Sequence, residues 1–119
     1  MVFISQEKIK LFRSFFRART DVYARFWIDF KTKKSGYVPV YRLNNPTQGL
    51  NNQVIFRHLI GKEAIGIYPL LPDNTTFFLA VDFDKDNWLT NANQLIKAAH
   101  DCNLSCYLER SKSGNGAHV

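Results

Sequence analysis

An unbroken apolar run that ends in acidic residues indicates how this chain is built: Phe77-Phe78-Leu79-Ala80-Val81-Asp82-Phe83-Asp84. Such a run is typical of a strand that is buried on both faces. Because residues two apart on a strand share a face, we expect Asp82 and Asp84 to project side by side while Phe83 points into packing. Two neighbouring carboxylates repel each other unless a cation lies between them, and Mg²⁺ or Mn²⁺ is the usual choice beside phosphates. The alternative is that the strand ends in water and both acids are solvated.

The segments around this run alternate between helical and strand patterns. Ser5 is positioned to cap the first helix, and Gly61 to end the second. A turn at Pro72-Asp73-Asn74 predicts that the apolar runs on its two sides pair as a hairpin. The order predicts a mixed α/β or α+β domain. The expected helices cover residues 5–16, 52–60 and 90–102, the expected strands cover residues 20–29, 38–43, 64–71, 75–83 and 105–110, and a polar loop is expected at residues 44–51.

Length and composition limit the possible classes of protein. The chain has 119 residues, of which 45% are hydrophobic, so it is one small globular domain or a piece of one. No stretch approaches the roughly 20 apolar residues of a membrane span, so no membrane partner is expected. The cysteines, Cys102 and Cys106, are too few for a disulfide scaffold and fit a reducing cytoplasm, where we expect the protein to be located.

Charge is distributed unevenly along the chain, whose net charge is +6. Residues 1–62 contain 12 Lys and Arg against 3 Asp and Glu, whereas residues 63–119 contain 4 against 7. The basic part is suited to a polyanion such as a nucleic acid, and the acidic part is suited to metal ions. A plain solvated surface explains the same distribution without any partner.

A glycine-rich segment near the end of the chain is the second candidate for chemistry: Glu109-Arg110-Ser111-Lys112-Ser113-Gly114-Asn115-Gly116-Ala117-His118. Asn-Gly between apolar strands is a strong hairpin signal, which alone accounts for the glycines. The functional interpretation is a phosphate cradle, in which backbone N–H groups, the two serine hydroxyls and the cations of Arg110 and Lys112 face an anion. His118 starts the return strand, where its imidazole can donate to a phosphate.

Taken together, the two candidates resemble the archaeo-eukaryotic primase superfamily, and specifically the primase-polymerase domain of the TOTE conflict systems. The last two of the matching stretches carry the specific motifs, Asp-x-Asp at a strand end and Ser-x-Ser-Gly-Asn-Gly-Ala-His. The matching stretches are residues 11–13, 19–25, 36–39, 58–61, 66–71, 78–84 and 108–118.

The resemblance implies a fold, an activity and a set of site residues. The fold would be an N-terminal α/β module over residues 1–62 and the start of an RRM-like catalytic sheet over residues 63–119. Asp82 and Asp84 would be the first catalytic motif and would hold two Mg²⁺ or Mn²⁺ ions for nucleotidyl transfer. The second motif would bind the triphosphate of the incoming nucleotide, and the basic part would lie along a DNA or RNA template or primer. Ser113, Gly116 and His118 would belong to the second motif, Arg110 and Ser111 would adjoin it, and the nucleotide-binding residues would also include Gly114 and Asn115.

Two departures from the family pattern refine these expectations. Residues 41–52 contain no cysteine, whereas relatives often carry a Cys cluster there, so no zinc is expected. The third motif of the superfamily, another acid, lies downstream of the His strand and is not among these residues. Since Val119 follows directly after a hairpin turn, we expect the chain to be a truncated N-terminal portion of one primase-polymerase domain, inactive alone. The parent would be the active enzyme, with helicase or nuclease domains as possible fusions or associates.

Two other functions are compatible with the same residues. In a non-enzymatic nucleic-acid-binding module, the acids would be surface residues and the basic part would make all contacts. In a metal-dependent nuclease, which ranks third, the Asp pair would cleave DNA without nucleoside triphosphates.

Overall fold

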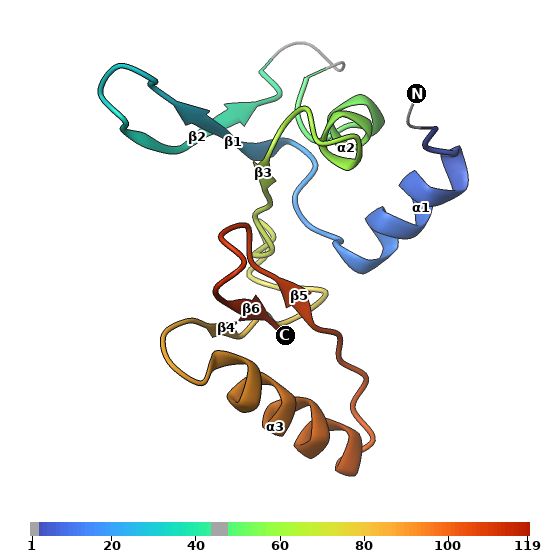
Figure 1. Cartoon of the computed structure of the whole chain (residues 1–119). Coiled ribbons are helices and arrows are strands. Elements are labelled where there is room, and N and C mark those ends of the chain that lie inside the picture. The colour runs from blue at the N-terminus through green and yellow to red at the C-terminus, as the bar shows by residue number, and fades with distance from the viewer. Residues whose placement is uncertain (1–2, 44–47) are drawn as a thin grey trace. The chain divides into compact units, whose positions relative to one another are not determined.

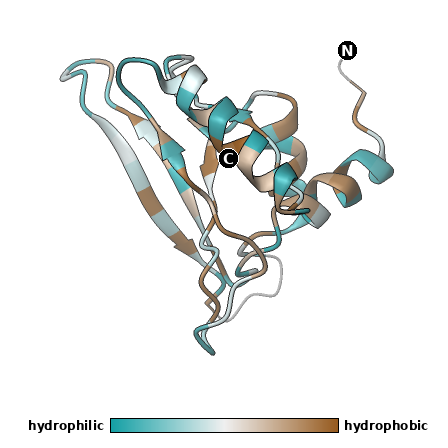
Figure 2. Cartoon of the chain, turned by 90° about the horizontal axis from the view of Figure 1, so that it is seen from below, coloured by the Kyte–Doolittle hydropathy of each residue, from teal (hydrophilic) through white to brown (hydrophobic). Residues whose placement is uncertain are grey.

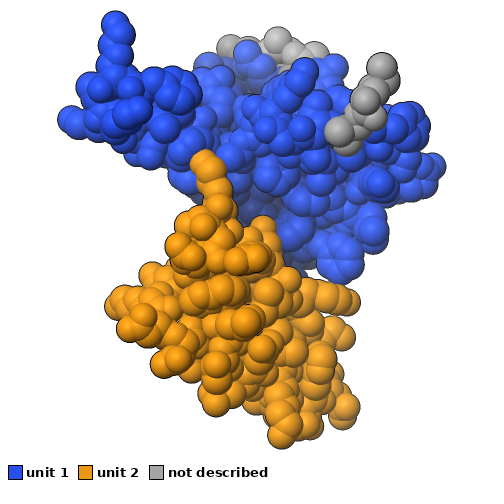
Figure 3. Space-filling model, in the orientation of Figure 1, with its two compact units in different colours: residues 1–78 blue, residues 79–119 orange. Residues whose placement is uncertain are grey.

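The computed structural model describes residues 3–43 and 48–119, and the expected loop at residues 44–51 therefore lies partly outside the described residues. Helices and two small antiparallel sheets alternate along the chain, which confirms a mixed α+β fold (Figure 1). The chain divides into two compact units, unit 1 (residues 1–78) and unit 2 (residues 79–119), shown in Figure 3. The boundary between the units lies sixteen residues after the point, between residues 62 and 63, at which the sequence changes from net basic to net acidic.

The sheet of unit 1 consists of β1 (Val22–Ile28), β2 (Ser35–Tyr41) and β3 (Ile65–Gly66) in the order β2-β1-β3. All neighbours are antiparallel. Strand β2 lies at the edge of this sheet, where Pro39 is tolerated because it has no N–H group to donate to a further strand. The turn between β1 and β2 is organised by Asp29, whose carboxylate accepts from the N–H groups of Lys31 and Thr32 and from the Thr32 hydroxyl.

Two helices supply the rest of the core of unit 1. They are α1 (Gln6–Phe15) and α2 (Asn52–Leu59), which are capped by the side chains of Ser5 and Asn51. Ile9 of α1 and Val54 and Ile55 of α2 belong to one buried cluster with Tyr23 of β1. Hydrophobic and hydrophilic residues alternate along the helical ribbons, as the brown and teal segments in Figure 2 show. The fully buried cluster consists of Ile9, Tyr23, Leu50, Val54 and Ile55.

Unit 2 is built around a smaller sheet. It contains β4 (Asp82–Phe83), α3 (Trp88–Asp101), β5 (Glu109–Arg110) and β6 (Ala117–His118), and the strand order is β4-β6-β5. Reciprocal backbone hydrogen bonds between Val81 and Val119 extend the β4–β6 pairing by one residue pair. Helix α3 packs against β4 and β6, where Ala92 and Ala117 are fully buried.

The expectation of a strand buried on both faces over the apolar run is wrong. Only Asp82–Phe83 form β4, and the side chains of Phe77, Leu79 and Val81 before it are exposed, Leu79 by as much as 84%. The pairing of β4 with β6 continues to Val81, which forms reciprocal backbone hydrogen bonds with Val119.

The predicted hairpin across Pro72-Asp73-Asn74 is also wrong, although its turn is present. The N–H of Leu71 donates to Thr75 O, and the carboxylate of Asp73 accepts from Thr75. The flanking residues pair elsewhere: Ile65–Gly66 join β1, and Asp82–Phe83 join β6. Burial explains this choice, since Ile65 packs against the core cluster of unit 1.

Other elements differ from expectation mainly in length. The strand expected at residues 105–110 is limited to β5, and the strand expected at residues 38–43 begins earlier, at Ser35. Helix α3 begins two residues early, and Leu95, Ile96 and Ala99, expected to be buried, are half-buried.

Candidate functional site

Strand β6 brings together three ionisable side chains from separate parts of the sequence. His118 is the register partner of Asp82 on β4 and of Glu109 on β5. Its Nε2 lies 3.4 Å from Asp82 Oδ1, and its Nδ1 lies 3.3 Å from Glu109 Oε2. Because directly paired residues point to the same face of a sheet, the three side chains form one row, here called the Asp-His-Glu row.

The Asp-His-Glu row faces solvent. The side chains of Asp82 and Glu109 are 68% and 56% exposed, and that of His118 is 43% exposed. A ring nitrogen that bears hydrogen can donate to a carboxylate, and either of the two acids can accept from its side of the ring. The row is therefore reachable by a ligand and offers it both acidic oxygens and an imidazole donor.

Asp84 follows β4 directly and is also exposed. The chain turns sharply after it, with positive φ angles at Lys85 (67°) and Asn87 (62°), and enters α3 at Trp88. Among the described residues, no three or more His, Cys, Asp or Glu side chains gather as a metal-binding group. The carboxylates of Asp82 and Asp84 nevertheless suit Mg²⁺, which is usually bound through one or two carboxylates with phosphate oxygens and water as the other ligands.

The glycine-rich segment forms the tight connection between β5 and β6. The N–H of Ser111 donates to Gly116 O at 2.9 Å, and the N–H of Gly114 donates to Ser111 O at 2.9 Å. Gly114 has a φ of +78°, which an L side chain rarely adopts. The hydroxyls of Ser111 and Ser113 lie 3.1 Å apart, and the N–H of Asn115 donates to Ser113 Oγ.

These bonds limit what the turn can offer to an anion. The N–H groups of Ser111, Gly114 and Asn115 all donate within the turn, contrary to a cradle in which every N–H points outward. Arg110 is also engaged, since its Nε donates to Gly114 O at 3.1 Å. The hydroxyls, whose hydrogens can rotate, and the remaining guanidinium nitrogens are among the groups that can meet a phosphate here.

Gly116 joins the turn to β4. A Cβ atom at this position would lie 2.6 Å from the carbonyl oxygen of Phe83 and 3.3 Å from Ser111 Oγ. Only glycine therefore permits this approach of the two backbones. The close contact fixes the turn against the strand that carries Asp82.

A hollow of about 420 Å³ lies beside the two motifs of unit 2. Its lining combines the loop after Asp84 with the tip of the glycine-rich turn and consists of Lys85, Asp86, Asn87, Trp88 and Asn115. The hollow thus has polar and charged groups together with one indole ring, a combination suited to a small polar ligand with an aromatic part.

Comparison with known protein families identifies the chain. Residues 7–119 match the family described as the TOTE conflict system, Archaeo-Eukaryotic Primase domain. The chain belongs to this family. No curated protein and no solved structure matches it. Within the described residues of this archaeo-eukaryotic primase domain, no helix has the length and apolar character that crossing a membrane requires.

Glu109 is the member of the Asp-His-Glu row that sequence reasoning missed. The register of the hairpin between β5 and β6 of this primase domain is the signal from which Glu109 could have been predicted. Once Ser111 is paired with Gly116 across the turn, antiparallel counting pairs Arg110 with Ala117 and Glu109 with His118. The other predicted site residues all belong to unit 2: Asp84 follows β4, Arg110 lies on β5, and the rest lie in the turn between β5 and β6.

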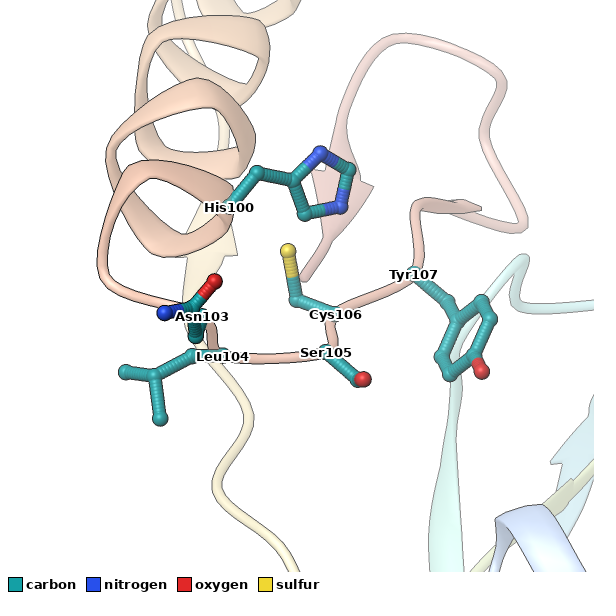
Figure 4. Close-up of a pocket in the computed structure, with 6 residues that line it drawn as sticks. All are labelled: His100, Asn103, Leu104, Ser105, Cys106 and Tyr107. Atoms are coloured by element: carbon teal, nitrogen blue, oxygen red, sulfur yellow. The ribbon is translucent and has the colours of Figure 1, made fainter.

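A second hollow of this primase domain lies at the far end of α3, with a volume of about 350 Å³. Figure 4 shows the ring of His100 and the thiol of Cys106 directed toward each other across it. Both cysteines are free thiols, and Cys102 is exposed. The remaining lining residues are Asn103, Leu104, Ser105 and Tyr107.

Proposed function

We propose that this primase domain provides the first two motifs of a metal-dependent nucleotidyl-transfer site that uses nucleoside triphosphates and a nucleic-acid 3′ hydroxyl. Family membership supports the class of reaction. The observation that carries the proposal is the pairing of Asp82 with His118, because it brings the acidic motif and the glycine-rich motif to adjacent strands.

In the proposed reaction, the 3′ oxygen attacks the α-phosphorus of the nucleotide, a new P–O bond forms, and the bond to pyrophosphate breaks. Asp82 and Asp84 would hold two divalent metal ions, which when bound would supply charge stabilisation at the reacting phosphate. The triphosphate would contact His118 and the turn residues Arg110, Ser111, Ser113, Gly114, Asn115 and Gly116. The imidazole and hydroxyl groups donate to its oxygens and so orient it for in-line attack.

Binding of the nucleotide by this chain is the first test. Isothermal titration with a non-hydrolysable nucleoside triphosphate should show binding that requires Mn²⁺ or Mg²⁺ and disappears with EDTA. Asp82→Ala together with Asp84→Ala should abolish the metal-dependent component. The matched control is Asp101→Ala, which removes an exposed carboxylate at the end of α3, away from both motifs, and should retain binding. Metal-dependent binding of equal strength in the double variant would exclude this metal-site assignment.

Template-directed primer extension by the full-length product of the gene tests the reaction itself. The wild-type protein should extend a primer with Mn²⁺, and the Asp82→Ala and Asp84→Ala double variant should not. Wild-type rates in the double variant would contradict the proposal.

The charge distribution favours one second candidate, a nucleic-acid-binding module without catalysis. Unit 1 contains 12 Lys and Arg against 5 Asp and Glu. This candidate predicts DNA binding that is independent of metal and falls steeply with salt, while no nucleotide binds in unit 2. The titrations above therefore separate the two functions.

A further inference from the structure

The sheet of unit 1 has one face that the helices do not use. Tyr23, Val40 and Ile65 point toward the helices and belong to the core of the unit or pack against it. Strand alternation and the β1–β2 register place the next residues along each strand on the opposite side. We call this side the outer face; its side chains include Val22, Ala24, Phe26 and Ile28 on β1 and Tyr37, Pro39 and Tyr41 on β2, of which Val22 is buried and the others are half-buried or exposed.

The outer face presents aromatic rings to solvent. Tyr37 is 50% exposed and Tyr41 is 51% exposed. The ring of Tyr37 is held in place, since its centroid lies 5.3 Å from that of Phe26 in an edge-on arrangement. Gly66 on β3 lies next to the ring, since a Cβ there would be at ordinary contact distance, 3.9 Å, from Tyr37 Cδ1. The exposed surface of Tyr37 is therefore preorganised for stacking.

Cations lie at both ends of the strand that carries these rings. Lys31, Lys33 and Lys34 are exposed in the turn before β2, and Arg42 is exposed directly after Tyr41. At about 3.3 Å per residue, Lys34 and Arg42 are about 26 Å apart along the strand. The nearest acid on the turn side, Asp29, is the carboxylate that organises the turn.

The acid near the other end of the strand is Asp21. It forms an ion pair with Arg19, whose Nη2 lies 2.6 Å from Asp21 Oδ2, so its negative charge is balanced there. The outer face therefore combines aromatic surfaces with an excess of positive charge at both ends. A polyanion with flat apolar groups complements it, which describes a nucleic acid.

The spacing of the rings selects the single-stranded form. Tyr37 and Tyr41 are about 13 Å apart along β2, whereas nucleotides in a duplex strand rise by about 3.4 Å each. Base pairs in a duplex also hide their faces from side chains. Unpaired bases that are splayed apart can stack on both tyrosines while the phosphates between them run toward the lysines and Arg42.

We propose that the outer face of unit 1 binds single-stranded nucleic acid by stacking bases on Tyr37 and Tyr41, with the backbone held by the lysine turn and Arg42. The identification of this strand as template or primer rests on the proposed function. The binding itself involves neither the acids of unit 2 nor a nucleotide, so the two proposals can fail separately.

Fluorescence anisotropy with a labelled 20-nucleotide oligo(dT), without metal or nucleotide, tests the stacking. Tyr37→Ala and Tyr41→Ala should each weaken binding about five- to tenfold, the lower end of the usual loss when one base no longer stacks on a ring, and the Phe substitutions should retain it. Tyr107→Ala, which removes a tyrosine of unit 2, is the matched control and should change the dissociation constant less than twofold. A duplex of the same sequence should bind more weakly and equally to all variants.

The phosphate contacts have a separate readout. The triple variant Lys31→Gln, Lys33→Gln and Lys34→Gln should reduce the slope of log K against log salt by about 2, because each phosphate contact on a single strand contributes about 0.7. The tyrosine variants should leave this slope unchanged.

Crosslinking with the wild-type chain keeps the proposal testable even if an alanine variant does not fold. An oligonucleotide with 5-iodouracil, irradiated in complex with the chain, should crosslink to Tyr37 or Tyr41 as mapped by mass spectrometry. Crosslinks confined to unit 2, unchanged affinity in both alanine variants, or a dimer that the tyrosine substitutions dissociate would each overturn the proposal.

Discussion

Nε2 of His118 lies 3.4 Å from Oδ1 of Asp82, although α3 and β5 lie between the two residues in the sequence. The antiparallel pairing of β4 with β6 produces this proximity, and the pairing of β6 with β5 adds Glu109 on the other side of the ring. Any change in the register of β6 by one residue would point the imidazole to the opposite face of the sheet.

The orientation of His118 gives the first prediction. His118→Ala should weaken metal-dependent nucleotide binding about tenfold, the usual effect of losing a hydrogen bond to a charged group. Glu109→Gln should have a smaller effect, since the amide oxygen can still accept from Nδ1 and hold the ring. Titration calorimetry measures both, and a larger loss for Glu109→Gln than for His118→Ala would contradict the assigned roles.

Gly116 gives the second prediction. Gly116→Ala should destabilise unit 2 by about 1–3 kcal/mol, because its Cβ would lie 2.6 Å from the carbonyl oxygen of Phe83. It should also weaken nucleotide binding, because the clash separates the turn from β4. Gly61→Ala is the control: no atom lies within 4 Å of its Cβ, so only the strain of its positive φ is expected. Urea denaturation followed by circular dichroism compares the two variants, and equal effects would exclude the steric explanation.

The core of unit 1 gives the third prediction. Ile55 on α2 is 2% exposed and belongs to the buried cluster. Ile55→Ala should reduce the free energy of unfolding by about 2–5 kcal/mol, as usual for truncation of a buried aliphatic side chain. Phe56→Ala, one residue later on the same helix but exposed, is the control and should cost less in urea denaturation. The reverse order would mean that α2 packs through its other side.

The hydroxyl of Tyr23 gives the fourth prediction. Burial, and then the nearby carboxylate of Glu63, raise the pKa of Tyr23 above its ordinary value. A raised pKa means that the folded state retains the proton longer than the unfolded chain does. The resulting stability is fully present below about pH 10, the pKa of an unfolded tyrosine, and is lost as the pH rises through the folded pKa.

Melting temperatures between pH 9 and pH 11 test this linkage. The wild-type chain should lose stability across the interval, and Tyr23→Phe should lose less because no buried hydroxyl ionises. Tyr107→Phe, at an exposed tyrosine, should follow the wild-type curve. If Tyr23→Phe and the wild-type chain had the same pH dependence, burial of the Tyr23 hydroxyl would not be coupled to folding.

Local signals in the sequence predicted much of the fold. Ser5 caps α1 and Gly61 follows α2 with a positive φ, because capping and left-handed turns depend on residues a few positions apart. The pairing of strands was harder to predict. The apolar pattern of residues 64–71 is equally compatible with pairing to 75–83 or to β1, and only the packing of Ile65 against the core decides between them.

The candidate site was predicted as two motifs but not as an arrangement. Asp82 and His118 were each recognised from their own segments, and the registers of β6 with β4 and β5 then determine that Glu109 completes the row. That alignment is a property of the paired backbones and not of any one segment.

The small buried content of unit 2 has a consequence for amide hydrogen exchange. Its fully buried hydrophobic residues, within the part of the chain that the structure describes, are Ala92 and Ala117, whereas those of unit 1 include Ile55 and Val22. Opening β4, β5 and β6 therefore exposes little apolar surface, so their amides should exchange with deuterium sooner than those of β1. The strands that carry the Asp-His-Glu row would then be the ones most readily rearranged around a ligand, and a bound nucleotide should slow their exchange more than that of any other strands.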